Sequence, residues 1–257
     1  PDKMLASAKD YLAKNDTKSA VIQIKNALQK NPDSSEARYL LGKALLDGGD
    51  RVAAEVELRK ALALKHPQDL VVPRLAQAMA GQGQFKKLIE EFGKTALTDP
   101  VAKADLQTWL ATAYGAQGDQ AAFGTALAAA LAAQPGYAAA LVVQARSKAM
   151  QRDFDGALAG VDQLIATDPR NHEAWKLKGD VQYHSKKQPD EALASYRKAI
   201  AAKPDFLSGH VGALTVLLEQ RKFADAQTQF EPLKKLAPNH PQTKFIETQL
   251  AFQKGDY

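Results

Sequence analysis

The sequence contains no cysteine, which excludes disulfide bonds, thiolate metal sites and a thiol nucleophile. Aromatic residues make up only 7% of its 257 positions, which is little for two compact cores. The longest strictly apolar run, residues 126–133, is far shorter than the ~20 residues that a membrane-spanning helix needs. With alanine at 47 positions, the sequence predicts a soluble, helix-rich chain without a transmembrane helix.

Charge of one sign is not concentrated anywhere in the chain. The 34 basic and 29 acidic residues give a net charge of +5, divided as +3 for 1–102, −1 for 103–170 and +3 for 171–257. The lysine doublets 86/87, 186/187 and 234/235 are a repeat length or more apart and lack aromatic residues for base stacking. The sequence therefore predicts no nucleic-acid binding.

Patterns that support catalysis are also missing. The five histidines have no metal-ligand spacing, and carboxylate pairs such as Glu55/Glu57, Glu90/Glu91 and Asp190/Glu191 fit helix starts or polar helix faces. The Gly81-Gln82-Gly83 segment follows no strand and precedes no Lys-Ser/Thr pair, and no Gly-x-Ser-x-Gly motif occurs. We therefore predict a protein without catalytic residues, metal ligands or cofactors.

Proline recurs at a nearly constant interval. Prolines 32, 67, 100, 135, 169, 204 and 238 are 33 to 35 residues apart, a period typical of helical hairpins in series. Turn-forming residues lie about halfway between them: Asn15-Asp16, Gly49-Asp50, Gly83-Gln84, Gly118-Asp119, Arg152-Asp153, Lys187–Asp190, Arg221-Lys222 and Gly255-Asp256. We interpret each interval as helix, turn, helix, turn, with Asp99-Pro100 and Asp168-Pro169 ending helices and starting turns.

Apolar residues within each interval follow a helical spacing. Ala20, Ile24, Ala27 and Leu28 share one helix face, and later intervals repeat this pattern. Small residues that would let paired helices approach closely recur at Gly42, Ala54, Ala145, Ala157, Gly179 and Ala192.

These features resemble the tetratricopeptide repeat, whose pattern is W-x2-L-G-x2-Y, then A-x3-F-x2-A, then P. The resemblance covers the whole chain and implies an all-α fold, a right-handed superhelical solenoid of antiparallel helix pairs with about seven repeats and an eighth opening helix. The chain departs from the pattern at Ser7, Phe123, Lys178 and Pro232, and one residue is inserted near Gln188-Pro189. The residues that carry the resemblance are Tyr11, Ala20, Ala27, Pro32, Gly42, Ala54, Ala61, Pro100, Pro135, Ala157, Pro169, Trp175, Gly179, Ala192, Ala199, Pro204, Ala226 and Pro238.

The resemblance implies one array over 1–257. Its expected repeats are 1–34, 35–68, 69–103, 104–137, 138–171, 172–206, 207–240 and the partial repeat 241–257. Because the pattern stops within a hairpin, we expect 1–257 to be part of a longer array.

A repeat array of this kind implies a concave groove lined by the first helix of each repeat. Transferring the family's groove positions gives the candidate binding residues Lys9, Tyr39, Lys43, Gln77, Thr112, Arg146, Lys176, Asp180 and Tyr183. This mixture could hold an extended peptide or a helix, although the tyrosines could instead pack between repeats and the lysines be solvated. Family members that bind chaperones use a Lys, Asn, Asn, Lys, Arg clamp, and Leu5, Lys9 and Leu40 depart from it, which disfavours that role.

Residues 11–50 are also similar to bacterial tetratricopeptide lipoproteins linked to PEP-CTERM/exosortase and exopolysaccharide systems. This finer resemblance implies a periplasmic scaffold, anchored to the membrane only through an N-terminal lipidated cysteine outside this sequence. Two alternatives remain open: a cytoplasmic adaptor, and the targeting array of an enzyme whose catalytic domain lies outside 1–257. No residue identifies the protein partner.

Overall fold

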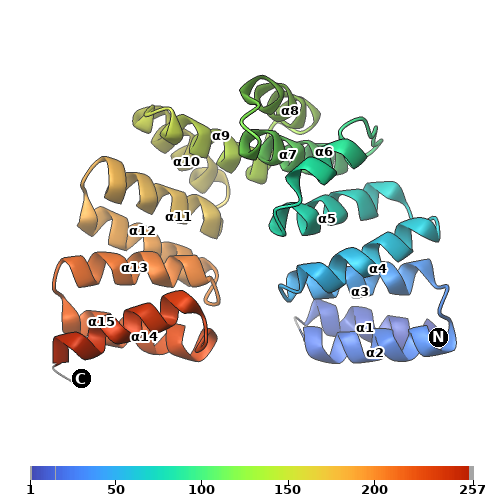
Figure 1. Ribbon diagram of the computed structural model, residues 1–257, viewed down its shortest axis with the longest axis horizontal. Helices are drawn as coiled ribbons and strands as arrows, with labels where there is room; N and C mark the ends of the chain where they lie inside the picture. Colours follow the sequence, from blue (N-terminus) through green and yellow to red (C-terminus); the bar gives the residue numbers. More distant parts are fainter. Residues whose placement is uncertain (1, 15, 255–257) are drawn as a thin grey trace. The chain divides into compact units, whose positions relative to one another are not determined.

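The computed structural model describes residues 2–14 and 16–254, and these ranges are built of α-helices joined by short turns, without strands (Figure 1). The predicted turn residues Asn15, Gly255 and Asp256 lie outside the described residues. The chain forms two compact halves, an N-terminal half (Pro1–Ala140) and a C-terminal half (Leu141–Tyr257). The all-α fold is confirmed, and the single continuous array stays a prediction.

In the described part of the N-terminal half, helices α1 to α8 follow one another, and each helix from α1 to α7 packs against the next (Figure 1). The first helices of its repeats are α1 (Asp2–Ala13), α3 (Ser35–Asp47), α5 (Gln68–Gly81) and α7 (Pro100–Ala116). The second helices are α2 (Thr17–Lys30), α4 (Arg51–Ala63), α6 (Phe85–Phe92) and α8 (Gln120–Ala133).

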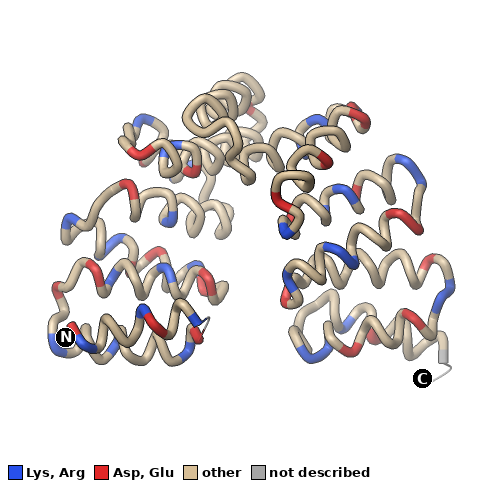
Figure 2. Tube along the Cα trace, turned by 180° about the vertical axis from the view of Figure 1, so that it is seen from behind, with Lys and Arg blue, Asp and Glu red and all other residues tan. Residues whose placement is uncertain are grey.

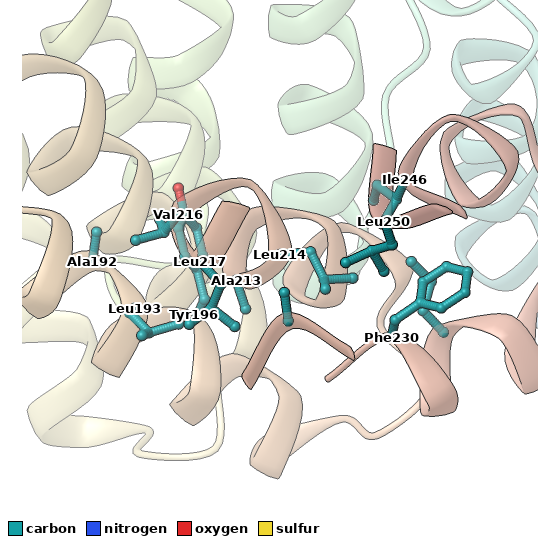
Figure 3. Packing of buried hydrophobic residues seen from close by; sticks show 12 residues of the cluster. Ala192, Leu193, Tyr196, Ala213, Leu214, Val216, Leu217, Phe230, Ile246 and Leu250 are labelled. Atoms are coloured by element: carbon teal, nitrogen blue, oxygen red, sulfur yellow. The ribbon is translucent and has the colours of Figure 1, made fainter. Parts of the chain in front are cut away.

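The C-terminal half continues the alternation, with α9 (Ala138–Met150) starting just before its boundary. Its other helices are α10 (Phe154–Thr167), α11 (His172–Asp180) with the π-helix η1 (Val181–Ser185), α12 (Pro189–Ala202), α13 (Leu207–Glu219), α14 (Phe223–Leu236) and α15 (Pro241–Lys254). Side chains from α12 to α15, among them Tyr196, Leu214, Phe230 and Leu250, share one buried cluster (Figure 3). This core fixes the helices that carry the candidate site.

The turns inside the hairpins have a common conformation. Gly49, Gly83 and Gly118 adopt left-handed backbone angles, with φ of 86°, 73° and 80°. The equivalent turns of the later repeats contain Arg152, Lys187 and Arg221, with φ of 67°, 57° and 55°. A residue with a Cβ adopts the left-handed backbone conformation only at a cost in free energy, so glycine suits these positions best.

Aspartates after several of these turns cap the second helices. The Asp50 carboxylate accepts a hydrogen bond from the Ala53 backbone N–H at 3.0 Å, and Asp153 accepts one from Gly156 at 2.9 Å. The carboxylate satisfies an N–H that has no partner inside the helix. The turn signals in the sequence therefore combine a left-handed residue with a helix cap.

The expected helix stop at Asp99-Pro100 is wrong. Asp99 caps the start of α7, accepting a hydrogen bond from the Ala102 N–H at 2.8 Å, and Pro100 is the first residue of that helix. Proline suits this position because the first N–H of a helix needs no intrahelical acceptor. The preceding α6 ends early, at Phe92 before Gly93, and α5 packs directly against α7.

The position expected for the inserted residue of the sixth repeat also needs correction. The chain absorbs the insertion at the end of the first helix, where the Lys186 N–H donates to the Val181 carbonyl at 3.1 Å and η1 replaces the last α-helical turn. Pro189, near which the insertion was expected, starts α12 normally. A widened π turn is how a helix accommodates one extra residue without losing its hydrogen bonds.

Small residues of the repeat pattern lie at the contacts between helices. The side chains of Ala20, Ala54, Ala61, Ala157, Ala192, Ala199 and Ala226 are fully shielded from solvent, and that of Ala27 nearly so. A Cβ added to Gly42 would lie 2.6 Å from the Leu58 Cγ, and one added to Gly179 would lie 2.7 Å from the Tyr196 ring. Tyr11 and Trp175 are partly buried, and the Trp175 indole N–H donates to the Pro169 carbonyl at 2.9 Å. None of the helices in the described part of the chain is long and apolar enough to cross a membrane.

Candidate binding groove

First helices of the C-terminal half place equivalent residues on one face. Lys176, Asp180 and Tyr183 have a spacing of four and three residues, which keeps them on one side of α11 and η1. Moving along the chain by one repeat gives Val211, Thr215 and Leu218 on α13, and by a second repeat Phe245, Gln249 and Phe252 on α15. We call these nine residues the groove positions of the C-terminal half.

A groove with a volume of about 690 Å³ runs between α13 and α15. Its apolar lining consists of Val211, Leu218, Phe223, Phe245, Ile246 and Phe252. Amide and hydroxyl side chains supply most of the remainder, namely Thr215, Gln242, Thr248, Gln249 and Gln253, and Glu219 is the single charged lining residue. The volume lies within the range of ordinary ligand pockets, about 300 to 1,000 Å³.

The candidate residues predicted from sequence do not include any residue of this groove. The repeat period could have found part of this groove. Val211, Thr215 and Leu218 lie one repeat after Lys176, Asp180 and Tyr183 and have the same spacing. Phe245 of the next first helix is 63% exposed, unusual for so large an apolar side chain.

Three of the predicted residues meet in a neighbouring pocket. Lys176, Asp180 and Tyr183 line a space of about 240 Å³ together with residues of α13 and Gln242. The Lys176 Nζ lies 2.6 Å from one Asp180 carboxylate oxygen, and the Tyr196 hydroxyl donates to the other at 3.0 Å. Burial and the negative charge of Asp180 raise the pKa of the Tyr196 phenol. The lysine charge is thus neutralised within its own helix.

Tyr183 borders a further pocket, of about 400 Å³, that also contains His184 and Glu219. The Tyr183 and His184 rings pack edge to face, with their centroids 4.8 Å apart. Burial and the adjacent Glu219 carboxylate raise the pKa of the Tyr183 phenol. The phenol therefore stays protonated at neutral pH and offers a hydroxyl rather than a charge.

In the N-terminal half, the predicted lysines form ion pairs. Lys9 lies 2.6 Å from Glu36 of the next repeat, and Lys43 lies 3.1 Å from Asp47 on the same helix. Tyr39 stacks on the imidazole of His66, with ring centroids 4.8 Å apart. This stacking agrees with the interpretation of Tyr39 as a packing residue.

Gln77 and Thr112 line a separate pocket of about 280 Å³, together with Trp109 and Phe85. The Thr112 hydroxyl donates to the Thr108 carbonyl at 2.9 Å, and the Gln77 side-chain oxygen accepts a hydrogen bond from Arg74 at 3.2 Å. The structure therefore brings Gln77 and Thr112 together but leaves Lys9, Tyr39 and Lys43 out of this pocket.

Arg146, the remaining candidate, lies on α9 with its side chain 52% exposed. Its guanidinium is 3.8 Å from Glu173, a long ion pair, and it lines none of the pockets described above. All four predicted cations thus have an acidic partner in the same chain.

One partly buried carboxylate lies at the start of α7. Burial raises the pKa of Asp105, although the nearby Arg74 charge and hydrogen bonding oppose this effect. Tyr137 lies next to it, and burial together with the Asp105 charge raises the pKa of its phenol.

Several of the carboxylates and lysines for which the sequence predicts no catalytic or nucleic-acid-binding role form ion pairs. Glu55, expected on a polar surface, is 8% exposed, and its carboxylate accepts from Arg59 at 2.8 Å and from Gln82 at 2.8 Å, which joins two repeats. Lys186 and Lys234 lie 2.6 and 2.7 Å from acids. Figure 2 shows acidic and basic residues interspersed along both halves. Among the described residues, no three His, Asp or Glu side chains gather as metal ligands.

The fold agrees with that of solved repeat proteins. A tetratricopeptide repeat protein from Parabacteroides merdae matches with a TM-score of 0.68 at 16% identity, covering 97% of this chain and 98% of that one. Yeast Tom70 matches with a TM-score of 0.66 at 18% identity, covering 99% of this chain and 57% of Tom70. PilF of Pseudomonas aeruginosa gives 0.51 at 17% identity, covering 86% of this chain and 85% of PilF. At these identities the likenesses show the fold alone.

Sequence comparison provides the family. A search of curated proteins gives no match. The tetratricopeptide repeat family model matches residues 5–69 and 142–205, which together make up half of the chain. Such repeats form protein-interaction scaffolds, and the match indicates no catalytic family. The chain belongs to the tetratricopeptide repeat family.

Proposed function

We propose that this protein is a scaffold that binds a segment of a partner protein in the groove between α13 and α15. The observation that carries this proposal is the register. The groove is lined by the α13 and α15 residues that correspond, one and two repeats later, to Lys176, Asp180 and Tyr183 of the neighbouring pocket. A repeat array offers such faces to its ligands because its other helix faces are used for packing.

The chemistry of the lining supports binding rather than reaction. Apolar side chains of both helices line the groove, and the amide groups among its lining residues can hydrogen-bond to a polypeptide. The exposed Phe245 ring loses water contact only when a ligand covers it.

Site-specific photocrosslinking in cells tests the proposal. A photoreactive amino acid replaces Gln249, which is exposed and lines the groove, or Asp225, which is exposed on α14 and lines none of the pockets described above. We expect a discrete adduct from position 249 that disappears when Phe245→Ser is added, and none from position 225. Adducts of equal yield from both positions, or an adduct insensitive to Phe245→Ser, would contradict the assignment.

For the cellular role, we propose a periplasmic scaffold of bacterial exopolysaccharide synthesis and export or of PEP-CTERM protein sorting, anchored as a lipoprotein. The similarity of residues 11–50 to such lipoproteins supports this proposal, as does the absence of cysteine from the repeats. The alternatives are a cytoplasmic adaptor and the targeting array of an enzyme. Mass spectrometry of the native full-length protein from cell fractions separates them: a lipidated cysteine before Pro1 in the membrane fraction supports the scaffold, whereas an unmodified soluble start contradicts it.

A further inference from the structure

We infer that the groove between α13 and α15 selects an apolar segment without acidic residues. This inference rests on the proposed function and adds the chemical class of the ligand. Its basis is the distribution of charge over the residues that face the ligand.

Cations at the candidate positions are not available to hold a carboxylate. Lys176, the one nearest the groove, lies 2.6 Å from Asp180, and both side chains are less than one-third exposed. An acidic ligand would have to displace Asp180, which also accepts the Tyr196 hydroxyl at 3.0 Å. Because a partly buried acid that loses its partners is costly, this exchange is unfavourable.

Glu219 gives the groove itself a negative charge. It is the single charged residue of the lining, and an acidic side chain placed in the groove would meet it with no cation among the lining residues. A neutral segment avoids this repulsion, and a basic side chain next to the apolar segment would be attracted. Repulsion of this kind selects against wrong partners even where apolar contact supplies the affinity.

The apolar lining sets the other requirement. Phe245 is 63% exposed and shares the groove with Ile246 and Val211. An exposed aromatic side chain that lines an apolar groove is the kind of residue that can supply much of the energy of an interface. A matching ligand therefore presents two or more large apolar side chains to this surface.

Fluorescence anisotropy with three synthetic peptides tests the inference. All three contain the same apolar centre of leucine and phenylalanine, flanked on both sides by serine and glutamine, by lysine, or by glutamate. We expect the neutral and lysine-flanked peptides to bind and the glutamate-flanked peptide to bind at least about tenfold more weakly. We also expect Glu219→Gln to strengthen binding of the glutamate-flanked peptide more than binding of the neutral peptide, so that the difference between the two peptides becomes smaller.

Two substitutions complete the design. Phe245→Ser should weaken every peptide by about tenfold or more, whereas Ile22→Ser, which alters a similarly exposed side chain on α2, should have no effect. Binding of the glutamate-flanked peptide that depends on both Phe245 and Lys176 would overturn the ligand class but keep the groove as a binding site. No loss of binding with Phe245→Ser, or no binding by any peptide, would contradict the groove assignment and the ligand class together.

Discussion

Replacing Gly179 with alanine provides a quantitative test of the packing in the C-terminal half. An added Cβ would lie 2.7 Å from the Tyr196 Cε1 and 2.8 Å from its Cδ1. The ring cannot move aside easily, because Tyr196 is 2% exposed, its hydroxyl is bonded to Asp180, and Gly212 approaches the same ring, so that a Cβ there would also lie 2.7 Å away. Two glycines therefore hold one aromatic ring between α11 and α13 (Figure 3 shows this ring in its cluster).

The expected magnitude is a balance of two effects. Alanine improves helix propensity over glycine by about 1 kcal/mol, whereas an overpacked core contact costs about 1 to 3 kcal/mol. Gly179→Ala should therefore destabilise the protein by about 1 kcal/mol. Gly160→Ala, on α10 of the same half, is the matched control, since its Cβ would have Ala145 at 3.9 Å, an ordinary contact distance. It should gain about 1 kcal/mol, for a difference of about 2 kcal/mol between the variants.

Urea unfolding followed by far-ultraviolet circular dichroism measures both variants at neutral pH. A double-mutant cycle with Tyr196→Leu isolates the contact, because the smaller side chain should relieve the crowding and give a coupling energy of about 1 kcal/mol or more. If Gly179→Ala unfolds at the same urea concentration as Gly160→Ala, or the coupling is zero, the close approach of α11 to Tyr196 does not limit the packing.

Four further substitutions test other features. Burial raises the pKa of Asp105, so the folded state binds this proton more tightly than the unfolded state, and stability falls as pH rises through the folded pKa. Asp105→Asn should therefore raise the urea midpoint at neutral pH. This gain should vanish below the ordinary aspartate pKa of about 3.9. Asp153→Ala removes a helix cap and should cost about 1 kcal/mol in the same assay. Arg221→Gly should stabilise the protein by up to about 1 kcal/mol, because it relieves a left-handed backbone at φ 55°, whereas Gly118→Ala should destabilise it by a similar amount. Destabilisation by Arg221→Gly, or stabilisation by Gly118→Ala, would refute the role of these turns.

Most of the fold follows from the period of the sequence. Regular prolines and small residues predict the alternating helices, because the same packing problem recurs in every repeat. The exceptions arise where a local residue outweighs the period. Gly93 ends α6 early and Asp99 caps the next helix, so Pro100 begins a helix instead of ending one. The π turn of η1 depends on where the helix can widen, which the residue count alone does not specify.

The groove was harder to predict than the fold. The positions transferred from the family carry mainly charged, polar and tyrosine side chains, whereas the groove depends on apolar residues of two later helices. The pairs Lys43–Asp47 and Lys176–Asp180 have the four-residue spacing that favours ion pairs on a helix and could have been read from the sequence. Lys9 and Glu36 are in different repeats, and their contact requires the packing of neighbouring helices.

The two classes of repeat position differ in how freely their chemistry varies. Ala157, Ala192 and Ala226 recur as alanine and are fully buried, because each lies where two helices touch. The equivalent groove positions change from Lys176 on α11 to Phe245 two repeats later on α15, since neither residue is needed to hold the helices together. Because the Phe245 side chain is 63% exposed, Phe245→Ser should weaken binding without changing the urea midpoint. Loss of binding in this variant is then interpretable as loss of a ligand contact.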